Sequence, residues 1–161
     1  MVILRKMTAD EYLRFKAYSI ADYANDLMSG KGFDREQALK VSQAEFSEVL
    51  SEGQETEGQF LMTVEETKMG KNVGWIWFFC EEDGDIRQVW LSDFLIYEEE
   101  RQKGYAKAAL TEMERTAKTA GCVRSVLYVW DHNLPGRSLY QKCGYVTALR
   151  KEGGSVMRKD L

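Results

Sequence analysis

The stretch Arg101-Gln102-Lys103-Gly104-Tyr105-Ala106 says most about how this chain folds and what it binds. It follows a strand-like run at residues 89–96 and opens a helix-like run at residues 107–119. A basic, glycine-centred turn in this position can hold a phosphate, because the first amides of a helix have no partner within it and the helix dipole favours negative charge there. Gly104 lets the backbone approach a ligand closely, and Ala106 adds little bulk. The segment therefore predicts an anion-binding turn, with an ordinary strand-to-helix turn as the alternative.

The composition limits the class of protein. A length of 161 residues suits one domain with a core covered on two sides, so we expect residues 1–161 to form a single domain. The apolar content of 44% and charged content of 30% are those of an ordinary globular protein. A net charge of −4 provides no basic field for nucleic acid, and no apolar stretch is long enough to span a membrane. We therefore expect no nucleic-acid partner, no membrane and no signal peptide.

The cysteines and the histidine indicate the compartment and the absence of a metal. Cys80, Cys122 and Cys143 have no paired spacing, which favours reduced thiols and a cytoplasmic location. We expect Cys143 to be a small packing residue rather than a nucleophile. His132 is the only histidine, so the chain has no His/Cys cluster with metal-ligand spacing, and we expect no metal.

The hydrophobic patterns predict strands and helices in the order β-α-α-β-β-β-α-β-α-β-β. Two N-terminal helices are expected to begin at Thr8, in a capping box with Glu11, and at Asp34; Gly30 and Gly32 are expected to interrupt the first. Because strands alternate with helices only in the second half, we expect an α/β (α+β) domain in which helices cover a mixed sheet. The expected strands are residues 2–4, 59–65, 72–80, 89–96, 125–130, 145–149 and 155–158, and the last two helices are residues 107–119 and 135–142.

The tryptophans raise two alternatives, an aromatic cage for a cation and core packing. Their positions in predicted strands favour the core. Alternation along the third strand puts Trp75 and Trp77 on one face and Ile76 and Phe78 on the other. Both faces are apolar, as expected for a strand that is buried on two sides.

Two further signals follow the turn at suitable spacing, Asn133 and the run Leu139-Tyr140-Gln141-Lys142-Cys143-Gly144-Tyr145. Together the three signals resemble the GNAT superfamily of acetyl-CoA-dependent N-acetyltransferases. Its members have an Arg/Gln-x-x-Gly-x-Gly/Ala turn, an asparagine and a Leu-Tyr-x-x-x-Gly-Phe/Tyr helix end. The similarity covers residues 89–161, and the N-terminal half matches only in the order of its elements. The resemblance implies a mixed, mostly antiparallel central sheet flanked by helices.

The resemblance also implies a site for coenzyme A. The amides of the turn would hold its pyrophosphate, with Lys103 and Lys107 adding positive charge. Where two parallel strands splay apart, backbone groups would pair with the pantetheine arm, and one amide would stabilise the oxyanion. Asn133 would cap the last helix or bind the arm, and Pro135 and Gly136, where many relatives have alanine, are expected to loosen that turn. The implied cofactor-binding residues are Phe94, Leu95, Ile96, Arg101, Gln102, Lys103, Gly104, Tyr105, Ala106 and Asn133.

Tyr140 is the candidate for the proton donor to the departing thiolate, since a phenol with a pKa of about 10 suits that transfer. A tyrosine that only packs is the alternative. The general base is open: several relatives have a glutamate where Tyr128 stands, while Asp93 on the neighbouring strand, acting directly or through water, and His132 are candidates here. An amine that binds already deprotonated would need no base.

The predicted activity is transfer of an acetyl group from acetyl-CoA, as cosubstrate, directly to a primary amine. The candidate acceptors are a protein N-terminus or lysine and a small amine such as a polyamine or an amino sugar. The acidic N-terminal half favours a cationic acceptor. A homodimer is compatible with the resemblance. The rival hypothesis is a non-catalytic acyl-CoA-binding sensor or interaction domain. A P-loop nucleotide site is a more distant alternative, because the turn lacks a Gly-Lys-Ser/Thr ending.

Overall fold

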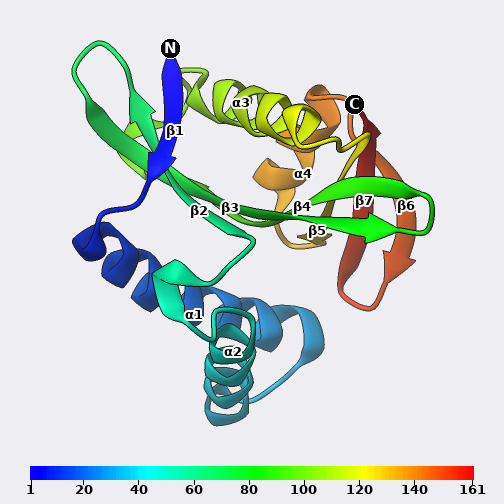
Figure 1. Cartoon of the computed structure of the whole chain (residues 1–161). Coiled ribbons are helices and arrows are strands. Elements are labelled where there is room, and N and C mark those ends of the chain that lie inside the picture. The colour runs from blue at the N-terminus through cyan, green and yellow to red at the C-terminus, as the bar shows by residue number, and fades with distance from the viewer.

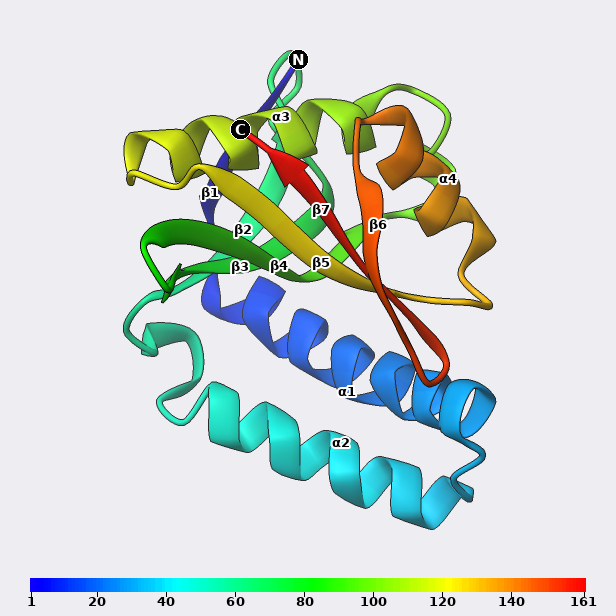
Figure 2. The ribbon, with the colours of Figure 1, turned by 90° about the vertical axis from the view of Figure 1, so that its right-hand side faces the viewer.

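One seven-stranded sheet separates two pairs of helices in the computed structural model, which describes residues 1–161. Figure 1 and Figure 2 show α1 and α2 on one face of the sheet and α3 and α4 on the other. The elements are β1 (Val2–Lys6), α1 (Ala9–Lys31), α2 (Arg35–Val49), β2 (Gln59–Glu66), β3 (Lys71–Asp83), β4 (Ile86–Ile96), α3 (Tyr105–Thr119), β5 (Arg124–Trp130), α4 (Leu134–Lys142), β6 (Val146–Lys151) and β7 (Gly154–Asp160). Their order confirms the predicted one, and β3 and β4 extend further into their shared hairpin than expected.

The first helix differs from its prediction. It begins as expected, at the capping box of Thr8 and Glu11, and ends at Gly32, which is left-handed with φ 67°. Gly30 does not interrupt it, because that glycine lies inside the helix and faces the ring of Trp130. A Cβ atom there would be 2.3 Å from the indole, so the position needs a residue without a side chain for close packing rather than for a turn.

The strand order is β1-β2-β3-β4-β5-β7-β6, and β4 with β5 is the parallel pair. That pairing is short and ends at Leu91 opposite Leu127. Beyond it β4 stays on β3 as far as Ile96, whereas β5 stays on β7 as far as Trp130. A bulge in β4 also leaves Ser92 without a partner on β3. Because the two strands follow different neighbours, a gap opens between them.

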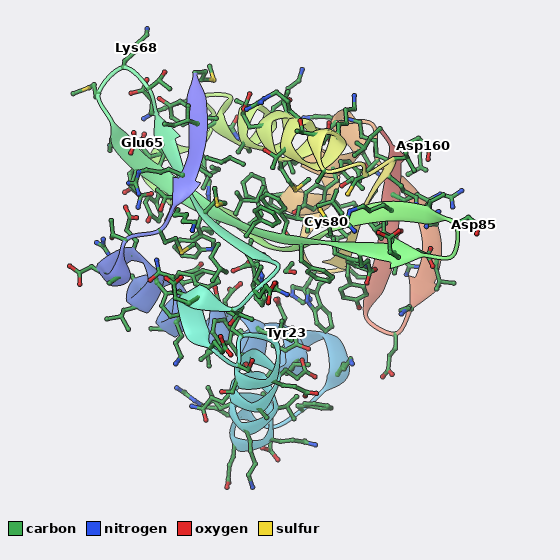
Figure 3. The ribbon with its side chains drawn as sticks, viewed as in Figure 1. Tyr23, Glu65, Lys68, Cys80, Asp85 and Asp160 are labelled. Carbon is green, nitrogen blue, oxygen red and sulfur yellow. The ribbon has the colours of Figure 1, made fainter.

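Side chains fill both sides of the sheet (Figure 3). Ile76 and Phe78 pack towards α3 in the larger core, while Trp75 and Trp77 belong to a separate core under α1 and α2. There Phe15 of α1 meets Trp75 edge-on, with the ring centroids 5.7 Å apart. The predicted alternation along β3 is therefore confirmed, and burial of each such side chain contributes about 1.5–3 kcal/mol.

Candidate active site

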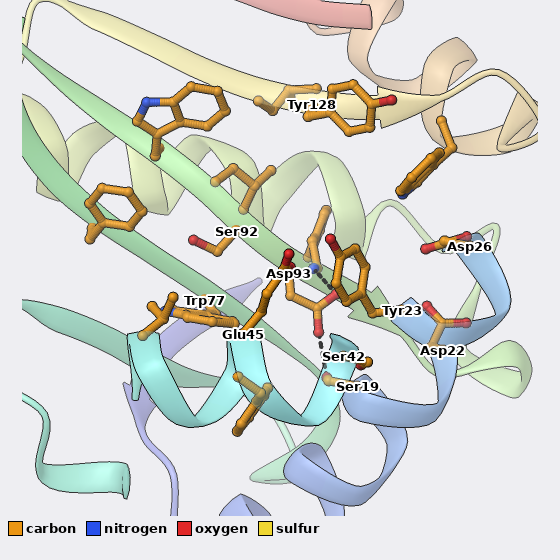
Figure 4. Close-up of a pocket in the computed structure, with 18 of the residues that line it drawn as sticks. Ser19, Asp22, Tyr23, Asp26, Ser42, Glu45, Trp77, Ser92, Asp93 and Tyr128 are labelled. Atoms are coloured by element: carbon orange, nitrogen blue, oxygen red, sulfur yellow. Dashed lines mark hydrogen bonds between the residues drawn. The ribbon is translucent and has the colours of Figure 1, made fainter. Parts of the chain in front are cut away.

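A cavity of about 480 Å³ lies where β4 and β5 separate. Its walls come from α1, α2, β3, β4, β5 and α4, and thus from both faces of the sheet (Figure 4). Tyr140 and Asn133 reach it from α4 and the turn before it, and Asp93 and Phe94 reach it from β4. The structure thereby brings together residues from the catalytic and cofactor-binding sets that the sequence suggested.

The turn before α3 has the free donors that an anion needs. Every amide from residue 102 to residue 107 donates to no acceptor within the protein. Gln102, with φ 62°, is the one non-glycine residue with a positive φ, and Gly104 follows with φ 84°. No side chain caps the helix at Gly104. Such left-handed turns direct successive N–H groups into one concavity, which suits a phosphate.

The charged side chains of this turn are partly engaged elsewhere. Lys103 Nζ lies 2.9 Å from the carboxylate of Glu100, a buried residue that also pairs with Lys71. Arg101 donates from Nε to the carbonyl of Ile96 at 3.0 Å and so holds the end of β4. Lys107 is exposed. The amides, rather than Lys103, are therefore the main donors that the turn can offer to an anion.

Only two of the three expected amides of β4 face the gap. Tyr97 donates to the carbonyl of Val73 on β3, at 3.0 Å. Because amides alternate in direction along a strand, Leu95 also faces β3, while Phe94 and Ile96 face the open side. The Phe94 amide donates to Oδ1 of Asp93 at 2.9 Å. Ile96 therefore has a free amide at the gap, and Phe94 has one held by the neighbouring carboxylate.

Tyr140 is buried but lacks a polar partner. Its side chain is 9% exposed, and its ring meets that of Tyr145 at 5.8 Å between centroids. Its hydroxyl has no hydrogen-bond partner within the protein and faces the cavity. Burial first, and the charge of Asp93 second, raise the pKa of Tyr140 well above its ordinary value. The phenol therefore keeps its proton at neutral pH and can donate it.

Asp93 is held by three donors. Oδ2 accepts from Ser19 Oγ at 2.6 Å and from Trp75 Nε1 at 3.1 Å, and Oδ1 accepts from the Phe94 amide at 2.9 Å. Burial raises the pKa of Asp93 above its ordinary value, the hydrogen bonds oppose that shift, and the nearby charge of Asp22 adds to it. A carboxylate with a raised pKa is a stronger base than an exposed one.

Asn133 adopts the capping role. Its Oδ1 accepts from the Gly136 amide at 3.0 Å, and the residue also lines the cavity. The expectation that Pro135 and Gly136 loosen the turn is wrong. A Cβ atom at Gly136 would lie 2.5 Å from Nδ2 of Asn133, so glycine leaves room for the side chain that caps the helix start, and a larger residue would make that side chain shift.

Sequence reasoning did not assign to the site a group of acidic residues in the same cavity, namely Asp22 and Asp26 of α1 and Glu45 of α2. In the sequence the two aspartates are marked only by their spacing of one helical turn, whereas Glu45 begins an acidic stretch that could attract a cationic substrate. His132 lies beside Asp26, with 2.7 Å between Nε2 and Oδ1, instead of standing alone on the surface. Tyr128 donates its hydroxyl to the carbonyl of Glu152, which ties β5 to the β6–β7 turn.

The other titratable candidates have structural roles. Cys143 packs against the larger core, and burial raises the pKa of its thiol, as expected for a packing residue. No three His, Cys, Asp or Glu side chains come together closely enough to hold a metal ion. No helix is both long enough and apolar enough to cross a membrane.

An unpaired turn for phosphate, splayed parallel strands and a buried phenol between them define a site for an acyl-CoA-dependent acyltransferase. The chain belongs to the Acetyltransferase (GNAT) family, whose model matches residues 20–145. It is an acetyltransferase, and acetyl-CoA-dependent acetylation is general for that family.

Known relatives agree with this assignment. The chain is 30% identical to YycN of Bacillus subtilis (strain 168), an uncharacterised N-acetyltransferase, over 99% of each chain. The crystal structure of YycN superposes with a TM-score of 0.83 and 28% identity, covering 94% of this chain and 98% of YycN. The PaiA N-acetyltransferase of Thermoplasma acidophilum, in complex with coenzyme A, shares the fold at 16% identity, with a TM-score of 0.73 and coverage of 100% and 99%.

The spermidine N-acetyltransferase of Vibrio cholerae, in complex with CoA and spermine, also shares the fold. Its TM-score is 0.65 at 17% identity, with coverage of 99% of this chain and 95% of that one.

Proposed function

We propose that the protein transfers the acetyl group of acetyl-CoA directly to a primary amine, with residues 1–161 acting as one catalytic domain. The observation that carries the proposal is the gap beyond the Leu91–Leu127 pair, lined by the unpartnered hydroxyl of Tyr140. Tyr140 is buried, but its hydroxyl has no hydrogen-bond partner within the protein and is free to donate to a substrate in the cavity.

The turn at residues 102–107 fits the pyrophosphate of coenzyme A. Its amides are unpaired, and its backbone is already in the left-handed conformation that gathers them, so little ordering is needed on binding. The Ile96 amide is a free donor for the pantetheine arm along the open side of β4. Acetyl-CoA bound there supplies an acetyl group activated as a thioester.

Tyr140 is the proposed acid. The amine nitrogen bonds to the carbonyl carbon, the carbon–sulfur bond breaks, and the departing thiolate takes the phenolic proton. The raised pKa of Tyr140 makes the phenol a weaker acid than a free tyrosine, so transfer of its proton depends on direct contact with the sulfur as the carbon–sulfur bond breaks. The Phe94 amide is the proposed donor to the oxyanion. If its hydrogen bond shifts from Asp93 Oδ1 to the developing oxyanion, that carboxylate oxygen becomes free to accept a proton.

Asp93 is the proposed base. Its raised pKa lets the carboxylate take the proton that the amine must lose, directly or through one water. That proton then returns through water to the Tyr140 phenolate, so that both groups regain their starting protonation states. His132 is held by Asp26 at 2.7 Å, and we assign it no part in this step.

The test is turnover with a panel of primary amines, followed by coenzyme A thiol release and by the mass of the acetylated product. Tyr140→Phe should lower kcat by about 10²–10⁴-fold, the usual contribution of a general acid, while coenzyme A binding is retained. Tyr18→Phe is the matched control, because Tyr18 is exposed and lies outside the cavity. If acetyl-CoA binds but the wild-type protein turns over no amine, the non-catalytic sensor hypothesis replaces this one.

We also infer that the reaction takes place in the cytoplasm. The three cysteines are free, with Cys122 buried and Cys80 and Cys143 partly so. Unpaired thiols are the usual state of a chain in a reducing compartment.

A further inference from the structure

The cavity carries far more negative charge than the transfer of an acetyl group requires. Besides Asp93, it is lined by Asp22 and Asp26 of α1 and Glu45 of α2, and no lysine or arginine lines it. Asp22 and Asp26 are one helical turn apart and therefore lie on the same face of α1. Figure 4 shows both carboxylates on the same side of that helix, beside Tyr23.

These carboxylates are not neutralised within the protein. Asp22 is exposed and makes no hydrogen bond or ion pair with another residue, and partial desolvation by the surrounding protein raises the pKa of its carboxyl. Asp26 uses only Oδ1 for His132, so Oδ2 remains open. The pKa of Asp26 is raised as well, by burial first and by the charges of Asp22 and Asp93. Like charges held this close are unfavourable unless a cation joins them.

A second observation, independent of the acidic group, indicates that this cavity takes a ligand. Tyr140 is 9% exposed, its hydroxyl has no partner, and it faces the same space. It approaches from α4, whereas Asp22 and Asp26 approach from α1, on the opposite face of the sheet (Figure 2). The reacting centre and the pair of aspartates therefore lie in different parts of one cavity.

Aromatic rings flank the aspartates. Trp130 lies between Tyr23, at 6.5 Å, and Tyr128, at 5.1 Å between ring centroids, and His132 stacks on it at 5.8 Å. Faces of such rings attract ammonium groups and cover alkyl chains. The β6–β7 turn closes in on the same region, with the ideal Cβ position of Gly153 2.8 Å from the Gly30 carbonyl. At about 480 Å³ the space suits a slender small molecule.

From these contacts we infer that the acceptor is a flexible diamine or polyamine, whose distal ammonium binds between Asp22 and Asp26 while its other amino group, uncharged, reacts between Tyr140 and Asp93. The inference rests on the proposed function and adds the substrate class. A single amine would leave the aspartate pair unused. The distal ammonium of a diamine neutralises the aspartate pair and thereby aligns the other amino group for reaction. The pair therefore selects the acceptor and takes no part in the chemistry.

The experiment compares acceptors that differ only in the distal charge: diaminobutane with butylamine, and diaminohexane with hexylamine. For the wild-type protein, kcat/KM should be about 10–100-fold higher for at least one of the diamines than for the monoamine of the same chain length. This ratio corresponds to the usual free energy of hydrogen bonds to charged groups. Asp22→Asn combined with Asp26→Asn should remove that preference, whereas loss of the Asp22 charge beside Asp93 should change the rates of mono- and diamines by the same factor. Salt should weaken the preference in the wild-type protein only.

Glu48→Gln is the matched control, since Glu48 is an exposed carboxylate of α2 outside the cavity. Two results would overturn the inference: a loss of diamine preference in Glu48→Gln equal to that in the double variant, or equal rates for mono- and diamines in the wild type. Neither result would count against the acetyltransferase activity itself. If the double variant does not fold, Asp22→Asn alone serves, because Asp22 is exposed and has no partner. If no amine is turned over, calorimetric titration with diaminobutane and butylamine decides: equal affinities overturn the inference, and preferred diamine binding that Asp22→Asn abolishes supports it.

Discussion

Single side chains in this protein take their properties from neighbours that are distant in sequence. Tyr140, the proposed proton donor, has a raised pKa because it is buried and lies near the charge of Asp93. Asp93 in turn is oriented by Ser19, which comes from α1, and by Trp75 of β3. Neither residue would have these properties in an isolated helix or strand. The pKa of each residue is therefore set by the folded surroundings.

The pKa of Glu11 is also set by residues from other elements, and here the effect is on stability. It accepts from both terminal nitrogens of Arg5, at 2.9 Å each, from Thr63 Oγ1 at 2.8 Å and from the Thr8 amide at 2.8 Å. These bonds, chiefly that with Arg5, lower the pKa of Glu11 to about 2. The charged carboxylate thus joins β1, the start of α1 and β2.

We expect Glu11→Gln to lower the free energy of unfolding at neutral pH by about 2–3 kcal/mol. Because the folded pKa lies below the unfolded one, this stability is present above the unfolded pKa of about 4.5 and disappears as pH falls towards 2. Urea denaturation of both proteins between pH 7 and about pH 3 measures it. A difference that stays constant over this range would contradict the prediction, and Glu48→Gln should match the wild type throughout.

At the scale of elements, α4 is a short helix on which Tyr140 depends. The helix spans Leu134–Lys142, and its start is fixed by the Asn133 cap and by the glycine that makes room for it. A helix of this length is marginal by itself, so its cap and its packing decide where its side chains lie. Loss of the cap should therefore affect both stability and the position of the acid.

Asn133→Ala should cost about 0.5–2 kcal/mol in unfolding free energy, the usual value of an N-cap, and should lower kcat more than it raises KM for acetyl-CoA. Asn133→Ser is the control, since serine caps helices comparably well and should recover most of the stability. Chemical denaturation and steady-state kinetics give the two readings. If Asn133→Ser is as damaged as Asn133→Ala, the side chain acts by some route other than capping.

The whole molecule is two antiparallel sets of strands joined by one short parallel contact, β4 against β5. That junction is where the gap opens and where the acidic cavity lies. Because β4 continues on β3 and β5 on β7, the gap is a consequence of the sheet topology and needs no special residue at its edges. A ligand in the gap should bridge the two sets and stabilise the fold.

Coenzyme A should raise the melting temperature in a concentration-dependent way. At about 100 times its Kd, binding adds about 2.7 kcal/mol, which corresponds to a rise of roughly 5–10 °C for a domain of this size. Thermal denaturation at several coenzyme A concentrations measures it. The Asp22→Asn and Asp26→Asn double variant should show the full shift, because the aspartates do not face the phosphate turn. No shift at concentrations that saturate turnover would exclude this mode of binding.

Much of the fold could be predicted because its signals are local. The capping box at Thr8, the alternation from Trp75 to Phe78 and the Asn133 cap each depend on a few neighbouring residues, and the structure has them as expected. Gly30 was misjudged because its reason is a contact with Trp130, far along the chain. Asp22, Asp26 and Glu45 were missed for a similar reason, since acidic residues on exposed helix faces look alike until the helices are placed.

The sequence by itself determined the family and the order of the elements, and it predicted an anion-binding turn and a functional role for Tyr140. These depend on backbone preferences and short spacings, which act over a few residues. Only the tertiary structure decided which amides of β4 face the gap, that Lys103 is engaged by Glu100, and that aspartates of α1 share a cavity with Tyr140 of α4. The physical reason is that burial, charge and hydrogen bonding depend on distances in space, and the folded chain sets those distances by packing segments remote in sequence against one sheet.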